Sequence, residues 1–302
     1  MYQTLITPAQ LQQLIASGEP LRLFDCSFEL TDPDAGHHQF LTQHIPGATH
    51  AHLNEMLSEM HGRDTASGGR HPLPAREAFA NRLGAAGVRP DMQVVVYDRQ
   101  GANYCGRLWW MLRWCGHTAV AVLDGGLQAW VAQGLATRSG PADPVAPASQ
   151  PYGLRAPLVP MVTTSELMAR LGRADTTVLD ARGAPRFRGE TEPLDPVAGH
   201  IPGALNRPFP SNLGPDGRFK PAEVLRAEFL ALLGARAPET VVHHCGSGVS
   251  AIPNVLAMAV AGLGTGSLYA GSWSEWCTTP GAPCASSQAQ PPAASADTPL
   301  KH

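Results

Sequence analysis

The sequence lacks the features that mark several classes of protein. Its six cysteines form no C-x-x-C pair and no zinc-like cluster with histidine. No apolar run approaches the ~20 residues that cross a bilayer, and the N-terminus lacks the basic and apolar segments of a signal peptide. A net charge of -3 gives no reason to expect nucleic acid or membrane partners. We expect a protein of the reducing cytoplasm, with free thiols and without metal or cofactor.

An internal repeat organises the chain. Leu23-Phe24-Asp25 precedes the segment His-Ile-Pro-Gly-Ala at 44–48, and Val178-Leu179-Asp180 precedes the same five residues at 200–204. Strand-like apolar runs and tryptophan-bearing helical segments follow in the same order in both halves. Strands that alternate with helices predict an α/β fold with two duplicated domains, each a mainly parallel sheet flanked by helices.

Composition places the boundaries of these domains. Residues 139–160 are rich in Pro, Ala and Ser without periodicity, which is typical of a linker. We therefore expect a non-catalytic domain at 1–138 and a catalytic domain at 161–279. Residues 280–302 have a similar bias, and we expect them to form a disordered tail.

Cys245 is the candidate nucleophile. It ends a short apolar run, and Gly246 and Gly248 follow before a helical pattern begins. In such a strand–loop–helix junction, unpaired backbone N–H groups and the helix dipole favour an anion, so we expect Cys245 to react as a thiolate. A cysteine after an apolar run is more often core filling. The two glycines favour the functional interpretation, because a core position does not need such a loop.

The first half acts as an internal control for this loop. Alignment of the two Val-Val strands places Asp98 where the second half has Cys245, and residues 99–102 replace the glycine loop. One copy has kept the nucleophile and the other has lost it. The first half is therefore interpreted as a support domain, with the site between the halves.

These segments together resemble the two-domain rhodanese sulfurtransferases. The loop Cys-Gly-Ser-Gly-Val-Ser is similar to the 3-mercaptopyruvate sulfurtransferase type, in which threonine usually stands at the place of Ser250. Thiosulfate-preferring relatives usually carry basic residues where Gly246 and Ser247 stand. The resemblance also covers Gly69-Arg70-His71-Pro72-Leu73-Pro74 and Trp109-Trp110.

The resemblance implies sulfur transfer by double displacement. Cys245 would take sulfur from 3-mercaptopyruvate, release pyruvate and pass the sulfur to cyanide, a small thiol or thioredoxin. Ser247 and Ser250 would supply hydroxyl donors, although turn and N-cap roles also suit them. The loop residues expected to surround the persulfide are Gly246, Gly248 and Val249.

A donor with a carboxylate calls for arginine, because a guanidinium binds a carboxylate through two parallel hydrogen bonds. The resemblance points to Arg186 as this ligand. A second arginine is usual after a Glu-Pro pair, but here Leu194 and Asp195 follow Glu192-Pro193, and Arg188 is the candidate substitute. A solvated surface charge is the commoner role for any one arginine in such a segment.

The resemblance also suggests His44 and Asp34 for proton transfer. His200 occupies the place of His44 in the second half, so a structural role shared by the two copies is the simpler interpretation.

Three other functions are weighed. Phosphatases of related fold carry His-Cys-x5-Arg, but Ala251 stands at the arginine position, so a phosphate would lack its bidentate partner. Thiosulfate:cyanide transfer remains an alternative, as does a non-catalytic sulfur-carrier or binding module. The intact Cys245 loop argues against the binding module.

Overall fold

The computed structural model describes residues 1–62, 64–148 and 152–286. The first half contains a five-stranded parallel sheet in the order β1-β5-β4-β2-β3. Its strands are β1 (Leu5–Ile6), β2 (Leu21–Asp25), β3 (Ala48–His50), β4 (Gln93–Tyr97) and β5 (Val120–Leu123). Its helices are α1 (Pro8–Ser17), α2 (Ala35–Thr42), α3 (Arg76–Ala85), α4 (Cys105–Trp114) and α5 (Gly126–Ala132).

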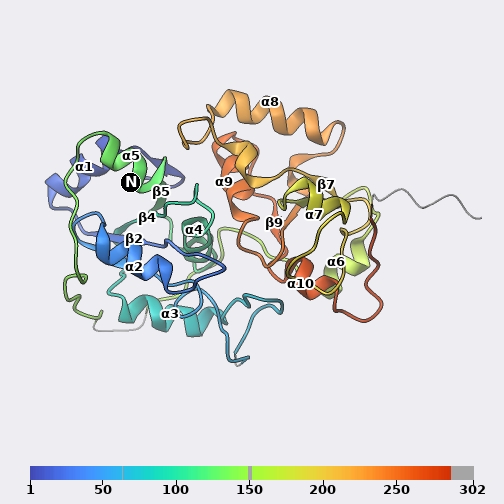
Figure 1. The fold of residues 1–302 in the computed structure, drawn as a ribbon, viewed down its shortest axis with the longest axis horizontal. Helices are drawn as coiled ribbons and strands as arrows, with labels where there is room; N and C mark the ends of the chain where they lie inside the picture. The colour runs from blue at the N-terminus through green and yellow to red at the C-terminus, as the bar shows by residue number, and fades with distance from the viewer. Residues whose placement is uncertain (63, 149–151, 287–302) are drawn as a thin grey trace, which may run out of the picture.

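The second half repeats this plan with a four-stranded parallel sheet in the order β7-β6-β8-β9. Its strands are β6 (Thr177–Asp180), β7 (Leu205–Asn206), β8 (Val241–His244) and β9 (Ser267–Leu268). Its helices are α6 (Thr164–Arg170), α7 (Ala184–Arg188), η1 (Phe209–Asn212), α8 (Ala222–Leu233), η2 (Pro238–Thr240), α9 (Ile252–Val260) and α10 (Ser272–Trp276). The predicted fold class is confirmed, and Figure 1 shows the halves as two lobes side by side.

Local sequence explains where these elements begin. Thr7 and Thr163 each cap the first helix of their half and form a reciprocal capping box, with Gln10 and Glu166 respectively. The central strands β4 and β8 are buried along their whole length, as expected for parallel strands covered on both faces.

The strand register confirms the alignment of the repeat. Asp25 pairs with Tyr97 in the first sheet, and Asp180 pairs with His244 in the second. The next residues, Asp98 and Cys245, therefore occupy the same place at the carboxyl end of the central strand. Ligands of open parallel sheets bind at this edge, where the strand order reverses.

The two halves share a core, in which α4 lies against α9 (Figure 1). The approach is close, since a Cβ on Gly106 would lie 3.3 Å from the side chain of Ile252. Arg107 is fully buried at this contact and donates to the carbonyl groups of Leu57, His71 and Gly248. The interface therefore contains a buried guanidinium as well as apolar side chains.

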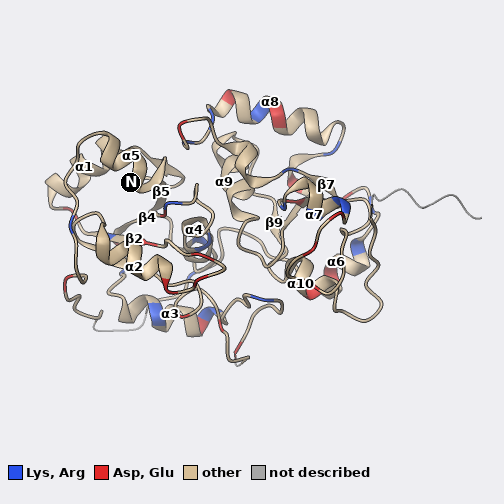
Figure 2. Ribbon diagram, viewed as in Figure 1, with Lys and Arg blue, Asp and Glu red and all other residues tan. Residues whose placement is uncertain are grey.

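Charged side chains of both signs are interspersed on the surface helices. Figure 2 shows basic and acidic residues along both α3 and α8. Among the described residues, every helix is too short or too polar to span a bilayer.

The expected disorder after residue 280 does not hold for residues 280–286. Ala285 and His200 exchange backbone hydrogen bonds of 2.7 and 2.9 Å, and the indole N–H of Trp276 donates to Pro283 O at 2.8 Å. These partners hold the segment against the second half. Residues 287–302 lie outside the described residues, as do 149–151 of the expected linker at 139–160. In the described part of this linker, Tyr152 is buried, and its hydroxyl oxygen lies 2.9 Å from His117 Nδ1.

Replacement of Arg107 by methionine should destabilise the protein strongly. The substitution leaves three buried carbonyl groups without their donor, and each unsatisfied buried polar group costs about 1–3 kcal/mol. We expect the free energy of unfolding to fall by about 3–5 kcal/mol in urea titrations. Arg236→Met is the matched control, because Arg236 is exposed. Equal effects of the two substitutions would contradict a structural role for Arg107.

Candidate active site

Cys245 is held in a fixed position at the end of β8. Its side chain is 2 % exposed. Its N–H donates to Ser272 Oγ at 3.0 Å, and its carbonyl accepts from Trp273 N at 3.0 Å. Ser272 Oγ in turn donates to Tyr269 O at 3.0 Å. Cys245 is thus held at the start of α10, as well as in its own strand.

Ser272 has an unusual backbone conformation for this purpose. Its φ is +55°, in the left-handed region. The equivalent residue of the first half has nearly the same φ, +59°, but is a glycine, Gly126. A non-glycine residue in this region costs of order 1 kcal/mol. The second half accepts this cost at a residue whose hydroxyl is bonded to the N–H of Cys245. No role was expected for Ser272 from the sequence.

The loop after Cys245 presents a series of backbone donors. Within the described part of the chain, no N–H group from Gly246 to Ala251 donates a hydrogen bond. Gly248 turns the loop with φ +75°, and a Cβ there would lie 2.1 Å from Ala270 O. A concave array of this kind binds anions.

The first half shows what this loop geometry binds. There the carboxylate of Asp98 accepts hydrogen bonds of 2.8 to 3.0 Å from four backbone N–H groups of its own loop, those of Gln100, Ala102, Tyr104 and Cys105. The first half thus carries a side-chain acid where the second half has a cysteine. The register therefore supports the interpretation of the 245–251 loop as an anion cradle.

A buried cation lies beneath this cradle. Arg107 donates to Gly248 O at 3.3 Å from the first half. Burial lowers the pKa of Arg107 to about 10, and a thiolate at Cys245 acts to raise it. The guanidinium therefore remains charged at neutral pH and favours an anionic sulfur. Nothing in the sequence pattern distinguishes Arg107 from the other arginines.

His71 of the first half contacts the loop through Ser247. Its Nδ1 lies 2.8 Å from Ser247 Oγ, and both side chains are buried. Burial, together with Arg107 and Arg70, lowers the pKa of His71 to about 3. The imidazole is therefore neutral at physiological pH. The segment at 69–74 was noted in the sequence, but no role was expected for His71.

A cavity of about 290 Å³ opens above Cys245 between the halves. Of the predicted site residues, those that line it are Cys245, Gly246, Ser247, Ser250 and Arg186. Arg70 and Leu30 of the first half also line it, as do Arg182 and Phe209 of the second. Gly248 and Val249 belong to the same loop but do not line the cavity, and Val249 is packed in the core.

Arg186 is oriented by acidic neighbours. It donates to Glu192 Oε1 at 2.7 Å and to Asp195 Oδ2 at 3.2 Å. Glu192 also accepts from Arg182 at 3.3 Å, and Arg182 pairs with Asp180 at 2.7 Å. The side chains of both acids are buried, and they hold the partly exposed Arg186 in a defined position at the cavity wall.

The remaining sequence candidates lie elsewhere. Arg188 is 43 % exposed and pairs with Glu190 at 2.6 Å, outside the cavity. Asp34 is exposed before α2. His44 is buried; its Nδ1–H donates to Phe40 O at 2.8 Å, and its ring stacks on Phe40 at 4.0 Å.

His200 repeats the arrangement of His44. Its Nδ1–H donates to Phe187 O at 2.7 Å, and its ring stacks on Phe187 at 4.0 Å. Two copies with one geometry favour the structural interpretation of this histidine. Neither His44 nor Asp34 lines the cavity at Cys245.

Known proteins with this arrangement identify the family. The profile of the rhodanese-like domain matches residues 7–133 and 163–279. The chain belongs to the rhodanese-like family. A Pseudomonas aeruginosa protein of this family, named as a probable 3-mercaptopyruvate sulfurtransferase, is 45 % identical over 93 % of this chain and 97 % of its own. The thiosulfate sulfurtransferase of Gallus gallus is 32 % identical over 91 % of this chain and 93 % of its own.

A solved structure of the same rhodanese-like architecture agrees with these matches. The 3-mercaptopyruvate sulfurtransferase from Leishmania major superposes with a TM-score of 0.77 at 31 % identity, over 91 % of this chain and 74 % of that one.

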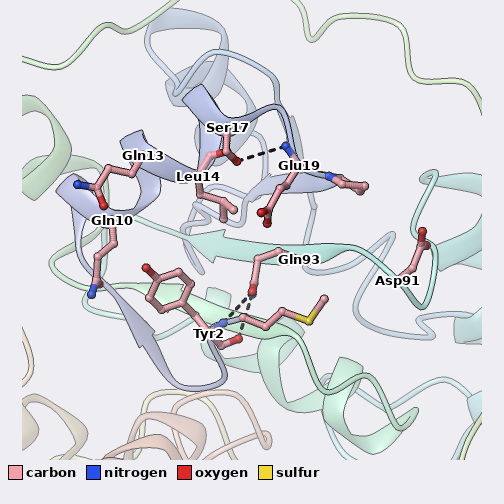
Figure 3. Close-up of a pocket in the computed structure, with 10 residues that line it drawn as sticks. Tyr2, Gln10, Gln13, Leu14, Ser17, Glu19, Asp91 and Gln93 are labelled. Carbon is pink, nitrogen blue, oxygen red and sulfur yellow. Dashed lines mark hydrogen bonds between the residues drawn. The ribbon is translucent and has the colours of Figure 1, made fainter.

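A second cavity, of about 330 Å³, lies away from this chemistry (Figure 3). It is found where β1, β2 and β4 begin, at the edge of the first sheet opposite to Asp98. Figure 3 shows Gln93 hydrogen-bonded to the backbone of Tyr2 in its floor. The described residues that line it include no cysteine, histidine or arginine. Cys245 and the arginines of the candidate site therefore lie at the other cavity.

Replacement of Gly248 by alanine should distort the cradle. The new Cβ would overlap Ala270 O at 2.1 Å, and the loop would have to move. We expect a loss of at least about 2 kcal/mol of stability and of most transfer activity. Gly264→Ala is the matched control, because its φ of +77° is similar while its surroundings are open. It should cost only about 1 kcal/mol and leave turnover intact. Urea unfolding and steady-state assays of both variants decide between these outcomes.

Proposed function

We propose that this protein is a sulfurtransferase that moves sulfur from 3-mercaptopyruvate to a thiophilic acceptor through a persulfide on Cys245. The observation that carries the proposal is the position of Cys245 at the start of a loop whose backbone N–H groups donate to no acceptor within the described residues, and whose first-half counterpart binds a carboxylate. The relative at 45 % identity supports the choice of donor.

The first half-reaction balances without an oxidant. The Cys245 thiolate forms an S–S bond to the sulfur of 3-mercaptopyruvate as the C–S bond breaks. The electron pair of that bond leaves with carbon as the enolate of pyruvate, which takes up the proton of the donor thiol. The persulfide remains as an anion, and the N–H groups of the 246–251 loop stabilise it.

Ser247 and His71 supply a path for this proton. The serine hydroxyl faces the cavity, and the neutral imidazole 2.8 Å away is able to accept and return a proton. Ser250 adds a second hydroxyl to the cavity wall. Proton transfer is thereby assigned to His71 rather than to His44 or Asp34.

The second half-reaction regenerates the thiolate. Cyanide, a small thiol or thioredoxin attacks the outer sulfur, and the S–S electron pair returns to Cys245. With cyanide the product is thiocyanate. The buried cysteine requires that the outer sulfur project into the cavity, where an acceptor reaches it.

Arg186 binds the carboxylate of the donor in this proposal. It lies in the cavity wall beside Gly246, where a Cβ would be 3.4 Å from its Nη1. A guanidinium that is oriented by two buried acids loses little entropy when it binds a carboxylate.

Thiosulfate is the second candidate donor. A sulfonate and a carboxylate both accept hydrogen bonds from guanidinium, and the chicken relative is named for thiosulfate. The neutral residues Gly246 and Ser247 favour the organic donor. The ratio of kcat/KM for the two donors discriminates the candidates, and a higher value for thiosulfate would reverse the order proposed.

Replacement of Cys245 by serine or alanine should abolish sulfur transfer without unfolding the protein. Either residue fits the loop but cannot form a persulfide. Mass spectrometry of donor-treated wild-type protein should show the added mass of one sulfur atom at Cys245, and neither variant should show it there. Pyruvate and thiocyanate formation should fall to background. Persistent transfer by the alanine variant would contradict the mechanism.

Replacement of Arg186 by alanine should raise the KM for 3-mercaptopyruvate about 10- to 100-fold, because one charge-assisted pair of hydrogen bonds is lost. Arg188→Ala is the matched control, since its exposed ion pair lies outside the cavity. It should leave KM unchanged. Steady-state pyruvate release measures both, and an unaltered KM for Arg186→Ala would remove this residue from the donor site.

A further inference from the structure

We propose that Ser272 is a positioning residue for the nucleophile, and that its hydroxyl holds the backbone of Cys245 so that the sulfur meets the N–H groups of the 246–251 loop. The inference rests on the proposed function and deepens it. Ser272 is not one of the described residues that line the cavity at Cys245. It therefore acts on the chemistry only through the cysteine that it holds.

Cys245 lies one step beyond the paired part of its strand. β8 and β9 pair as far as His243 and Leu268, and the last bond of this ladder runs from Tyr269 N to His243 O at 2.9 Å. Continued by one step, a parallel ladder would join the N–H of Cys245 to Tyr269 O. The direction of the nucleophile is thus decided at the point where strand pairing ends.

The hydroxyl of Ser272 is inserted at this step. Ser272 Oγ accepts from Cys245 N at 3.0 Å and donates to Tyr269 O at 3.0 Å. Both side chains are buried, with 0 % exposure for Ser272 and 2 % for Cys245. Because the hydroxyl accepts one bond and donates the other, each bond polarises and strengthens its neighbour. One oxygen atom thus bridges the ends of the two strands where the chain turns into the loop.

The next residues of α10 bind the carbonyl groups of the same segment. Trp273 N donates to Cys245 O at 3.0 Å, and Ser274 N donates to Gly246 O at 2.9 Å. The peptide groups on both sides of Cys245 are therefore tied to consecutive residues of one helix. Since the backbone sets the direction of the Cα–Cβ bond, these contacts together fix where the sulfur lies.

The first half separates the hydroxyl from the other contacts. Gly126 stands at the equivalent place with φ +59°, and a Cβ there would lie 2.2 Å from Asp98 O. That half leaves no room for a side chain. The carbonyl contact is nevertheless present, because Leu127 N donates to Asp98 O at 3.3 Å. Backbone bonding is thus common to both copies, whereas the hydroxyl bridge belongs to the copy with the nucleophile.

The backbone at Ser272 favours a functional reason for this difference. A left-handed conformation is unfavourable for any residue with a Cβ, and glycine adopts it without strain. Strained residues persist at sites where the surrounding structure holds them for a purpose. What serine supplies here, and glycine lacks, is the hydroxyl on the N–H of Cys245.

The experiment compares two substitutions that remove this hydroxyl. Ser272→Ala keeps a Cβ at the left-handed position, whereas Ser272→Gly removes it and copies the first half. Reactivity is measured without a sulfur donor, as the rate of alkylation of Cys245 by iodoacetamide against pH, with peptide mass spectrometry to resolve the other cysteines. In both variants the midpoint of the pH profile should rise by about 0.5 to 1 unit, and the rate at neutral pH should fall about three- to tenfold.

Transfer from 3-mercaptopyruvate to cyanide gives a second readout. Both variants should lower kcat about tenfold and change the KM for the donor less than about threefold, because the thiolate is misplaced while the donor site is intact. A change in KM alone would contradict a role in positioning the sulfur.

Urea unfolding separates positioning from general loosening of the structure. The unfolding equilibrium constant of Ser272→Gly should be about three- to tenfold smaller than that of Ser272→Ala, because glycine suits the left-handed backbone. The two variants should nevertheless share the same thiol reactivity. Ala102→Gly is the matched control, since Ala102 has φ +66° in the first half and carries no hydroxyl. It should leave the alkylation profile and transfer unchanged.

A wild-type alkylation profile in either variant would overturn the role of Ser272. Recovery of reactivity in Ser272→Gly but not in Ser272→Ala would also overturn it, because reactivity would then follow stability rather than the hydroxyl. Absence of wild-type transfer from 3-mercaptopyruvate would instead overturn the proposed function. The alkylation result would still stand in that case, because it uses no donor.

Discussion

The structure depends on the way in which backbone N–H groups surround a negative charge at the end of a central parallel strand. Both halves build this arrangement from the same strand register. In the first half it binds the carboxylate of Asp98 through four N–H groups, and in the second the N–H groups of the loop after Cys245 donate to no acceptor within the described residues. Main-chain donors cannot be lost by side-chain substitution, and they need no reorganisation when the charge appears. The reactive residue could therefore change between the halves while the fold remained.

Much of this organisation could be predicted from the sequence, because the features concerned are local in the chain. A strand that ends in Cys245 and passes through Gly246 and Gly248 into a helix defines the loop within eleven residues, 241–251. The repeat of His-Ile-Pro-Gly-Ala fixed the domain count, and two histidines in equivalent places favoured the structural role that the matching geometries of His44 and His200 support. Arg186 was predicted from the family resemblance, and it lies in α7, the helix that directly follows β6 in its own domain.

The other contributors could not be found in this way, because they reach the site across the interface between the halves. His71 meets Ser247, and Arg70 meets Asp195, over more than a hundred positions of sequence. Arg107 lies on a helix whose apolar sequence predicts only core packing. Its three carbonyl partners, which distinguish it from the other arginines, are visible only in the structure. Asp195 was interpreted as the loss of an arginine, yet the structure pairs it with two. Residues 280–286 were expected to be disordered from composition, which does not register a two-residue bridge such as that between His200 and Ala285.

These contacts change the interpretation of the first half from a support to a part of the site. A duplicated domain whose cradle is filled by Asp98 cannot carry a persulfide, but its rigidity makes it a suitable base for charged groups. The buried guanidinium of Arg107 and the imidazole of His71 are placed by backbone contacts within that domain and are directed into the other. A buried charge at an interface is stabilising only when its partners are fixed, because desolvation otherwise exceeds the attraction. The carboxylate of Asp98 satisfies the loop of its own domain through four backbone N–H groups, and two of them, those of Tyr104 and Cys105, lie at the start of α4, the helix that carries Arg107.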